Sequence, residues 1–205
     1  MQTSKHIQKQ SLTKVWDPLV RSFHWLLAAA FLVAYASGED FLTLHVWAGY
    51  TIAIALIVRL IWGFIGTRHA RFSDFITRPS EAMQYAKDTL RGRAKRYLGH
   101  NPAGALMIIV MLVSLGLAVI TGFAAYGAAE HAGPLASWFV NSGKAWKNGL
   151  EEVHEFFANF SVLLILIHLA GVLFESLLHK ENLVSAMING YKRPVQDDLP
   201  HTVTK

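Results

Sequence analysis

The sequence contains no cysteine among its 205 residues. This absence excludes disulfide bonds and metal sites built from thiolates, because both need cysteine sulfur. It also excludes the C-x-x-C-H motif that attaches haem covalently, so any haem would have to be held by noncovalent contacts. Charge is scarce as well, since 16% of the residues are charged and 53% are hydrophobic. The class of the protein follows from where those few charges fall.

Four stretches of the chain are almost free of charge. Arg59 is the one charged residue within them, and they cover residues 22–38, 44–66, 103–129 and 156–174. A helix of about 20 apolar residues crosses about 30 Å of hydrocarbon, so the sequence predicts four transmembrane helices. A cleaved signal peptide is the alternative for the first stretch. The long polar lead before this stretch and the histidine inside it argue against that alternative.

Basic residues gather on one side of the predicted helices. Four precede the first helix, eight lie between the second and third, and four follow the fourth, whereas two lie between the third and fourth. Because cytoplasmic loops carry an excess of Lys and Arg, this distribution predicts that both termini are cytoplasmic. The other side carries acidic residues: Glu39, Asp40, Glu130, Glu151, Glu152 and Glu155. The net charge of +5 therefore reflects topology, and no nucleic-acid partner is expected.

The predicted fold class is an all-α integral membrane four-helix bundle with an additional cytoplasmic interfacial helix. We expect a cytoplasmic N-terminal tail over residues 1–16, a transmembrane domain over residues 17–193 and a cytoplasmic C-terminal tail over residues 194–205. The loop between the second and third helices contains SEAMQYAKDTLRGRAKRYL, which combines helix-forming residues with a basic side. This composition favours a helix that lies against anionic lipid headgroups. A calmodulin-like or nucleic-acid-binding patch is the less favoured alternative.

Four of the ten histidines fall at or within the predicted helices, namely His24, His45, His154 and His168. A single histidine there can simply bond to a neighbouring helix, but ionisable groups in a membrane are costly and usually functional. With both termini inside, His24 lies toward the cytoplasm and His45 toward the outside. His154 is also outer and His168 lies deeper. These two are 14 residues apart, which is about 21 Å along nearly the same helix face.

Two imidazoles about 21 Å apart cannot share a metal ion, so each needs a partner at its own depth. Depth gives an outer pair (His45 and His154) and an inner pair (His24 and His168), although residue counting places His168 somewhat deeper than His24. Imidazole pairs without a nearby carboxylate or thiolate favour haem iron, because the porphyrin supplies the other four ligands. The sequence therefore predicts two noncovalent haem b sites stacked across the membrane.

Two arginines are candidates for binding haem propionates. Arg59 follows His45 by 14 residues, so it lies on the same helix face about 21 Å deeper, at the level of the inner pair. A buried guanidinium needs an anion, and the predicted helices offer no carboxylate at this depth. Arg21 is a second candidate for an inner propionate. The alternative for Arg59 is a side chain that extends to the cytoplasmic interface.

Several motifs cover nearly the whole span from Val15 to Arg193, namely VWDPLVRSFHW, LHVWAGY, RLIWGFIGTRHARFSDF, GHNPAG, EEVHEFFANF and IHLAGVLFESLLHKENLVSAMINGYKR. Together they resemble the membrane cytochrome b subunits of the bacterial cytochrome b561 and nickel–iron hydrogenase b-type cytochrome superfamily. The resemblance implies a bundle in the bacterial inner membrane that holds two b haems on the same four histidines. Such proteins exchange electrons between membrane quinone and a redox partner, often outside the membrane.

The leading hypothesis is an electron-transfer subunit that links the quinone pool to a periplasmic partner, such as a c-type cytochrome or a hydrogenase-like subunit. Its acidic outer loops would steer a basic partner. The alternative is a stand-alone oxidoreductase of the same family that oxidises superoxide and reduces quinone, although an acidic outer face would repel superoxide. A third interpretation, a haem-free scaffold or metal transporter, predicts a colourless protein. His100 in GHNPAG is a candidate for quinone binding or proton transfer, or else an interfacial residue at a helix start.

Overall fold

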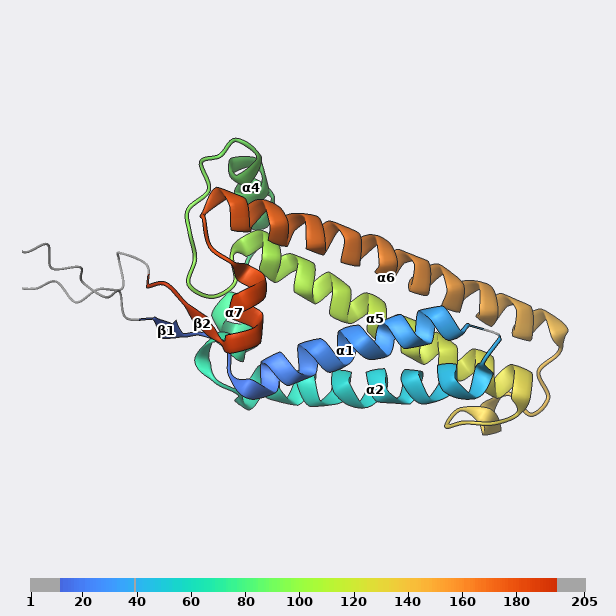
Figure 1. Ribbon diagram of the computed structural model, residues 1–205. Coiled ribbons are helices and arrows are strands. Elements are labelled where there is room, and N and C mark those ends of the chain that lie inside the picture. The colour runs from blue at the N-terminus through green and yellow to red at the C-terminus, as the bar shows by residue number, and fades with distance from the viewer. Residues whose placement is uncertain (1–11, 39, 195–205) are drawn as a thin grey trace, which may run out of the picture.

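Four long helices dominate the computed structural model, which describes residues 12–38 and 40–194. They run side by side along one axis (Figure 1) and are α1 (Pro18–Ser37), α2 (Leu42–Ile65), α5 (Pro102–Glu130) and α6 (Lys144–Leu178). Each is long and apolar enough to cross a membrane. The prediction of an all-α fold with four helices able to cross a membrane is therefore confirmed. Of the two predicted tails, residues 1–11 and 195–205 lie outside the described part of the chain.

Two of the long helices begin where an N-cap residue is followed by proline. The Asp17 side chain accepts a hydrogen bond from the backbone N–H of Val20 at 2.9 Å, and Pro18 is the first residue of α1. Asn101 likewise accepts from the N–H of Gly104 at 2.7 Å, one residue before α5 begins. These side chains satisfy N–H groups that a helix leaves free in its first turn. α1 therefore begins four residues before the apolar stretch 22–38, and α5 begins one residue before the stretch 103–129.

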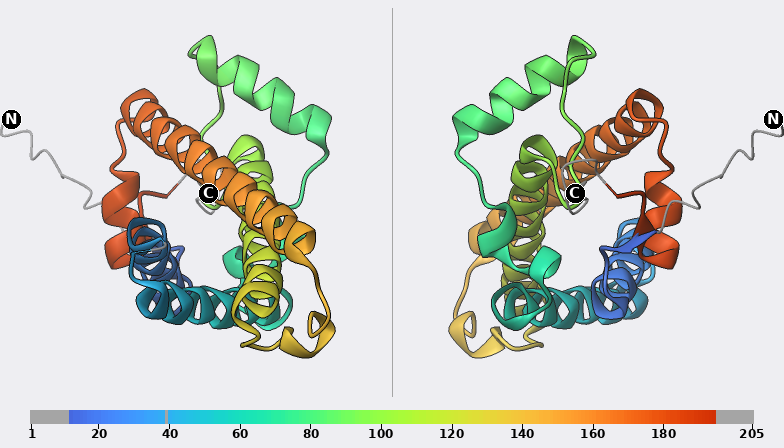
Figure 2. Two further views of the ribbon diagram at one scale, coloured as in Figure 1. Left: turned by 90° about the vertical axis from the view of Figure 1, so that its right-hand side faces the viewer. Right: turned by 90° about the vertical axis from the view of Figure 1, so that its left-hand side faces the viewer.

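The helices pack as two antiparallel hairpins. α1 packs on α2 and α5 packs on α6, and contacts between α2 and α5 join the hairpins (Figure 2). The core contains the small side chains Ala30, Ala34 and Ala48 together with Phe31 and Ile52. Small residues let membrane helices approach closely. Many large apolar side chains of the four long helices are exposed, as expected for helices that face lipid.

α6 is longer than the apolar run that predicted it. The run begins at residue 156, whereas the helix begins at Lys144 and extends to Leu178 over 35 residues. Such a helix measures about 52 Å, which exceeds the hydrocarbon thickness. Its first turns are amphiphilic, and Lys147 lies 3.9 Å from Glu151 in a pair spaced by four residues. The extension therefore projects α6 beyond the other helices at one end (Figure 1).

Short elements gather at the two ends of the bundle. The end where α1 begins and α6 ends is called the inner end, and the opposite end is called the outer end. The inner end carries β1 (Thr13–Lys14), η1 (Arg68–Ala70), α3 (Phe72–Phe75), α4 (Pro79–Leu90), α7 (Leu183–Asn189) and β2 (Tyr191–Lys192), and the outer end carries η2 (Ala136–Trp138). β1 pairs with β2 in antiparallel register, with Thr13 opposite Lys192. Residues at the end of the predicted N-terminal tail thus belong to the folded inner end.

Asp17 fastens the start of α1 to the end of α2. Besides capping α1, its carboxylate accepts hydrogen bonds from the Trp62 indole at 3.1 Å and from the Thr67 hydroxyl at 2.6 Å. Burial by itself would raise the pKa of Asp17, but these bonds and the cap outweigh it and hold the pKa below its usual value. The carboxylate is therefore ionised in the folded protein at neutral pH.

A second acidic residue fastens the C-terminal segment. Glu181 is buried between Arg96, whose Nη2 donates to its carboxylate at 2.6 Å, and Lys192, whose Nζ lies 3.6 Å away. Burial would raise the pKa of Glu181, but the bond from Arg96 and the charge of Lys192 hold it below its usual value. This network ties the loop before α5 to α7 and β2.

Candidate functional site

The outer pair lies between α2 and α6. The ring centres of His45 and His154 are 5.9 Å apart and the two planes are perpendicular. Both side chains are partly buried. The structure therefore brings together the two histidines that sequence reasoning placed at the outer level.

Main-chain carbonyl groups orient both rings of the outer pair. Nδ1 of His45 lies 2.8 Å from the carbonyl oxygen of Ala34, and Nδ1 of His154 lies 2.9 Å from that of Ala118. A carbonyl oxygen can only accept, so Nδ1 carries the proton in each ring and donates it. Each ring is then neutral, and the free lone pair on its Nε2 is available to bind a metal.

Gly122 makes room for the outer pair on the side of α5. A Cβ atom at this position would lie 2.9 Å from Cε1 of His154 and 3.1 Å from its Nδ1. Both values are shorter than a normal van der Waals contact, so the ring could not keep its place beside a larger residue. Gly122 therefore lets α5 approach the His154 ring closely enough for the carbonyl of Ala118 to accept the hydrogen bond from Nδ1.

The inner pair lies between α1 and α6. The ring centres of His24 and His168 are 6.4 Å apart with an interplanar angle of 52°. Residue counting had placed His168 deeper than His24, because counting assumes straight helices that stand upright. α6 slants across the bundle (Figures 1 and 2), and the two rings come to the same level. Nδ1 of His24 is buried and has no hydrogen-bond partner within the described chain.

Both pairs fit a haem iron with two axial histidines. Two metal–nitrogen bonds of about 2 Å, together with the ring radius at each end, place the ring centres about 6 Å apart. The measured separations of 5.9 and 6.4 Å match this value. Among the described residues, no three His, Cys, Asp or Glu side chains gather as an ion site. The donor set therefore suits a group that brings its own equatorial ligands.

Arg59 lies in the interior at the inner end of α2. The residue is 3% exposed, so protein atoms cover its side chain. Its guanidinium carbon lies 4.9 Å from the ring centre of Phe72 and 6.0 Å from that of Phe75. Nη1 is buried, and none of the described residues accepts a hydrogen bond from it. A buried guanidinium with a free donor is suited to bind an anion.

Arg21 has a different environment. Its Nη1 donates to the carbonyl oxygen of Ile188 near the C-terminus of α7, where helix carbonyls are free to accept. The Nε atom is buried, and the described part of the chain offers it no acceptor. Arg21 thus fastens α7 to α1, and its predicted role toward a propionate stays a prediction.

His100 lies just before α5 between two aromatic rings. Its ring centre is 4.5 Å from that of Trp16 and 4.6 Å from that of Phe75. Burial, followed by the charges of Arg59 and Lys192, lowers the pKa of His100 to about 3. Nδ1 is buried without a partner among the described residues. The ring is therefore neutral at physiological pH, and its predicted role in quinone binding or proton transfer stays a prediction.

Sequence reasoning missed a buried pair of hydroxyl groups between α5 and α6. Ser114 and Ser161 are each 2% exposed, and their Oγ atoms are 2.8 Å apart. One signal was present in the sequence, because Ser161 lies seven residues from both His154 and His168. Its partner could not be found this way, since the contact depends on how α5 is rotated against α6.

Comparisons with known proteins identify related sequences. A sequence model of the family described as prokaryotic cytochrome b561 matches residues 15–190. The "Probable Ni/Fe-hydrogenase B-type cytochrome subunit" of Azotobacter vinelandii is 26% identical over 229 residues, covering 95% of this chain and 93% of that protein. The protein of the same name from Cupriavidus necator is 25% identical, with 88% and 86% covered.

A further relative comes from Escherichia coli K12. Its "Probable Ni/Fe-hydrogenase 1 B-type cytochrome subunit" is 26% identical, and the alignment covers 87% of this chain and 89% of that protein. No solved structure matches the chain. The similarity thus extends over almost the full length of this chain and of each relative.

Proposed function

Because the chain belongs to the prokaryotic cytochrome b561 family, we propose that it is a di-haem b electron-transfer subunit that links membrane quinone to a redox partner on the outer side. The observation that carries the proposal is the geometry of α6, which contributes one histidine to each of two pairs with ring centres 5.9 and 6.4 Å apart. These two histidines of α6, His154 and His168, are 14 residues apart, and the corresponding distance of about 21 Å along the helix spans most of the hydrocarbon.

The histidines supply the axial ligands in this proposal. His45 and His154 hold the outer haem, with Nδ1 of each ring already donating to a backbone carbonyl. His24 and His168 hold the inner haem. The haem iron supplies the one-electron chemistry when it is bound. The polypeptide keeps the ligands at two fixed depths and surrounds them with apolar side chains that exclude water.

Arg59 is the residue best suited to bind a propionate of the inner haem. Its buried guanidinium has a free donor at Nη1 within the described chain, and a propionate would supply the missing acceptor through a charge-assisted hydrogen bond. Arg21 lies on α1 three residues before His24. Its buried Nε supports a weaker, second contact with the same group.

We place both termini and the inner end of the bundle in the cytoplasm. The described residues at this end carry most of the basic side chains, as the positive-inside rule requires. α4 lies crosswise to the four long helices (Figure 2) and exposes Met83 and Leu90. This orientation supports its predicted place at the interface, where apolar side chains can enter the lipid and basic ones can meet anionic headgroups.

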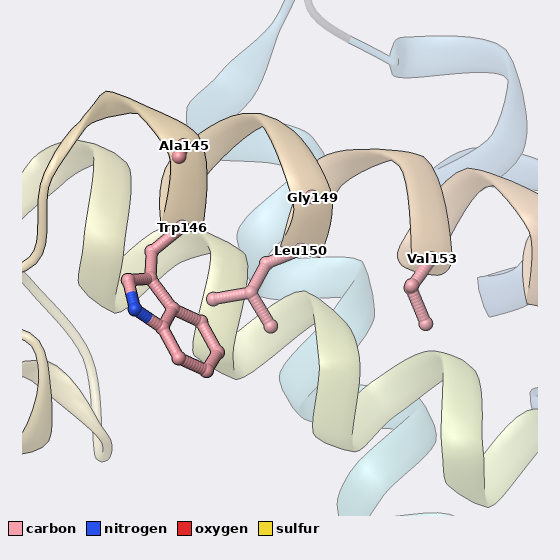
Figure 3. A pocket seen from close by; sticks show the side chains of 5 residues that line it. All are labelled: Ala145, Trp146, Gly149, Leu150 and Val153. Carbon is pink, nitrogen blue, oxygen red and sulfur yellow. The ribbon is translucent and has the colours of Figure 1, made fainter.

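The outer end is the proposed contact with the redox partner. The relatives are named as hydrogenase subunits, which favours a hydrogenase-like protein over a c-type cytochrome. The projecting first turns of α6 carry a shallow apolar hollow (Figure 3), lined by Ala145, Trp146, Gly149, Leu150 and Val153. Acidic residues on the same turns would steer a basic partner by charge.

Electron transfer across a sealed membrane tests the proposed function. Purified protein in liposomes should carry electrons from dithionite outside to ferricyanide trapped inside, neither of which crosses the membrane. His45→Ala and His168→Ala should each abolish this transfer, because each removes one of two sites in series. His131→Asn is a matched control at the end of α5, where the backbone is left-handed and Asn is tolerated. Full transfer by either histidine variant would contradict the proposal.

The same preparation separates the subunit from the stand-alone oxidoreductase. Superoxide generated outside partner-free liposomes that contain quinone should give no quinol above a protein-free control. Quinol formation at a rate proportional to the protein would instead establish the superoxide activity.

A further inference from the structure

The face of α6 that carries the two histidines also carries a hydroxyl halfway between them. Ser161 is seven residues after His154 and seven residues before His168. Seven residues correspond to about 10 Å along the axis and to nearly two full turns, so the three side chains lie on almost the same helix face. Ser161 therefore lies at the midpoint between the outer pair and the inner pair.

Ser161 is held in one orientation by two hydrogen bonds. Its Oγ donates to the backbone carbonyl of Phe157 at 2.8 Å, and it lies 2.8 Å from Oγ of Ser114. A hydroxyl has one proton, so Ser161 can donate to Phe157 only if Ser114 donates to Ser161. The O–H bond of Ser161 then points toward Phe157, which lies toward the outer pair.

The surroundings of this hydroxyl are dry. Ser114 and Ser161 are 2% exposed, and the neighbouring positions Leu115 and Leu164 are also buried. In an apolar interior of low dielectric constant, a fixed dipole acts over a longer range than it does in water. The positive end of the Ser161 dipole faces the outer pair, and its negative end faces the inner pair.

We propose that Ser161 is a positioning residue that separates the redox potentials of the two haems through this fixed dipole. The inference rests on the proposed function, since it requires a haem at each pair. A positive end stabilises the reduced form of the centre that it faces, and a negative end stabilises the oxidised form. Ser161 thus raises the midpoint potential of the outer haem and lowers that of the inner haem, which favours the electron on the outer haem.

The competing explanation is that the two serines only join α5 to α6. Hydrogen bonds between membrane helices commonly have this role. The two explanations differ for Ser114. Ser114→Ala removes the bond between the helices but leaves the Ser161 hydroxyl bonded to Phe157, whereas Ser161→Ala removes both the bond and the dipole.

Redox titration of the two haems, followed by their visible absorption bands in the parent and the alanine variants, tests the inference. Ser161→Ala should lower the outer potential and raise the inner one. Ser114→Ala should shift each by less than half as much. Ser142→Ala, which removes a hydroxyl that bonds the carbonyl of Phe139 in the loop before α6, should leave both potentials unchanged. Ser161→Thr retains a hydroxyl able to bond the same carbonyl and should restore the parent values.

Three results would overturn the inference. They are unchanged potentials in Ser161→Ala, shifts of both potentials in the same direction, and equal shifts in Ser114→Ala and Ser161→Ala. Haem content, measured first in the parent, separates this failure from that of the proposed function. A parent with fewer than two haems contradicts the proposed function, whereas a parent with two haems that fails the titration contradicts only the role of Ser161.

Discussion

The outer and inner histidine pairs differ in what holds their rings. Both rings of the outer pair donate from Nδ1 to a helix carbonyl, so the backbone fixes their tautomer and orientation. In the inner pair, Nδ1 of His24 is buried with no such partner in the described chain. The inner end is fastened instead by side chains around it, through the networks of Asp17 and Glu181. The outer ligands are therefore pre-oriented by the backbone, whereas we expect the inner ligands to depend on the surrounding scaffold.

Breaking the scaffold of the inner end should have the largest effect. Glu181→Gln removes the negative charge that faces Arg96 and Lys192, and Lys192 is 5% exposed. Leaving a buried charge without its partner costs about 3–5 kcal/mol, so the variant should unfold more readily in detergent and lose the inner haem before the outer one.

A surface pair gives the matched control for Glu181. Glu151→Gln breaks the pair with Lys147, in which both side chains are more than two-fifths exposed, and pairs of this kind contribute about 1 kcal/mol or less. Equal stability losses in the two variants would contradict the role of the buried network. Loss of the outer haem first would contradict the assignment of that network to the inner end.

Crowding the outer pair should have the next largest effect. Gly122→Ala places a methyl group within 2.9 Å of the His154 ring, which must then move and lose its bond to Ala118. Changes in groups that orient a metal ligand cost about 10–100-fold in affinity. We expect a loss of that size in retention of the outer haem, measured by dilution into apomyoglobin, with the inner haem unaffected.

Gly116→Ala provides the control on the same helix. Apart from the adjacent residues and the nearby backbone of α5 itself, no described atom lies within 4 Å of the position that its Cβ would take, so both haems should be retained as in the parent. A similar loss in both glycine variants would show that α5 tolerates no added methyl group, and the specific contact with His154 would then be wrong.

Acid should weaken the inner end by a smaller amount. The folded-state pKa values of Asp17 and Glu181 lie below their ordinary values of 3.8 and 4.5. A depressed carboxyl pKa contributes stability above the unfolded value, and this contribution is lost as the pH falls through the folded value. The free energy of unfolding should therefore decline as the pH drops below about 4.5. Glu181→Gln should show a shallower decline, and an unchanged slope would contradict the role of this carboxylate.

The sequence predicts the elements of this fold more completely than their contacts. Apolar runs identify the four long helices, and Asp17 and Asn101 mark two of the starts. The length of α6 is missed because its first turns are polar and lie outside the hydrocarbon signal. Helix periodicity also says nothing of how two helices are rotated against each other.

The candidate site shows the same limit. Depth alone is sufficient to pair the histidines, because a ligand on one helix must meet a partner at its own level. Depth cannot predict the contact of His154 with the carbonyl of Ala118 or that of Ser161 with the hydroxyl of Ser114. Both contacts require α5 at a particular rotation and height beside α6. Pairing by depth also left a mismatch at His168, which the slant of α6 removes.

The number of haems per polypeptide tests the central claim most directly. A pyridine haemochrome spectrum of the protein purified in detergent should give two b haems in the parent, provided that haem supply during expression is sufficient. His45→Ala and His168→Ala should each retain about one, because each breaks a different pair and leaves the other intact. One haem or none in the parent, or two in either variant, would contradict the two stacked sites.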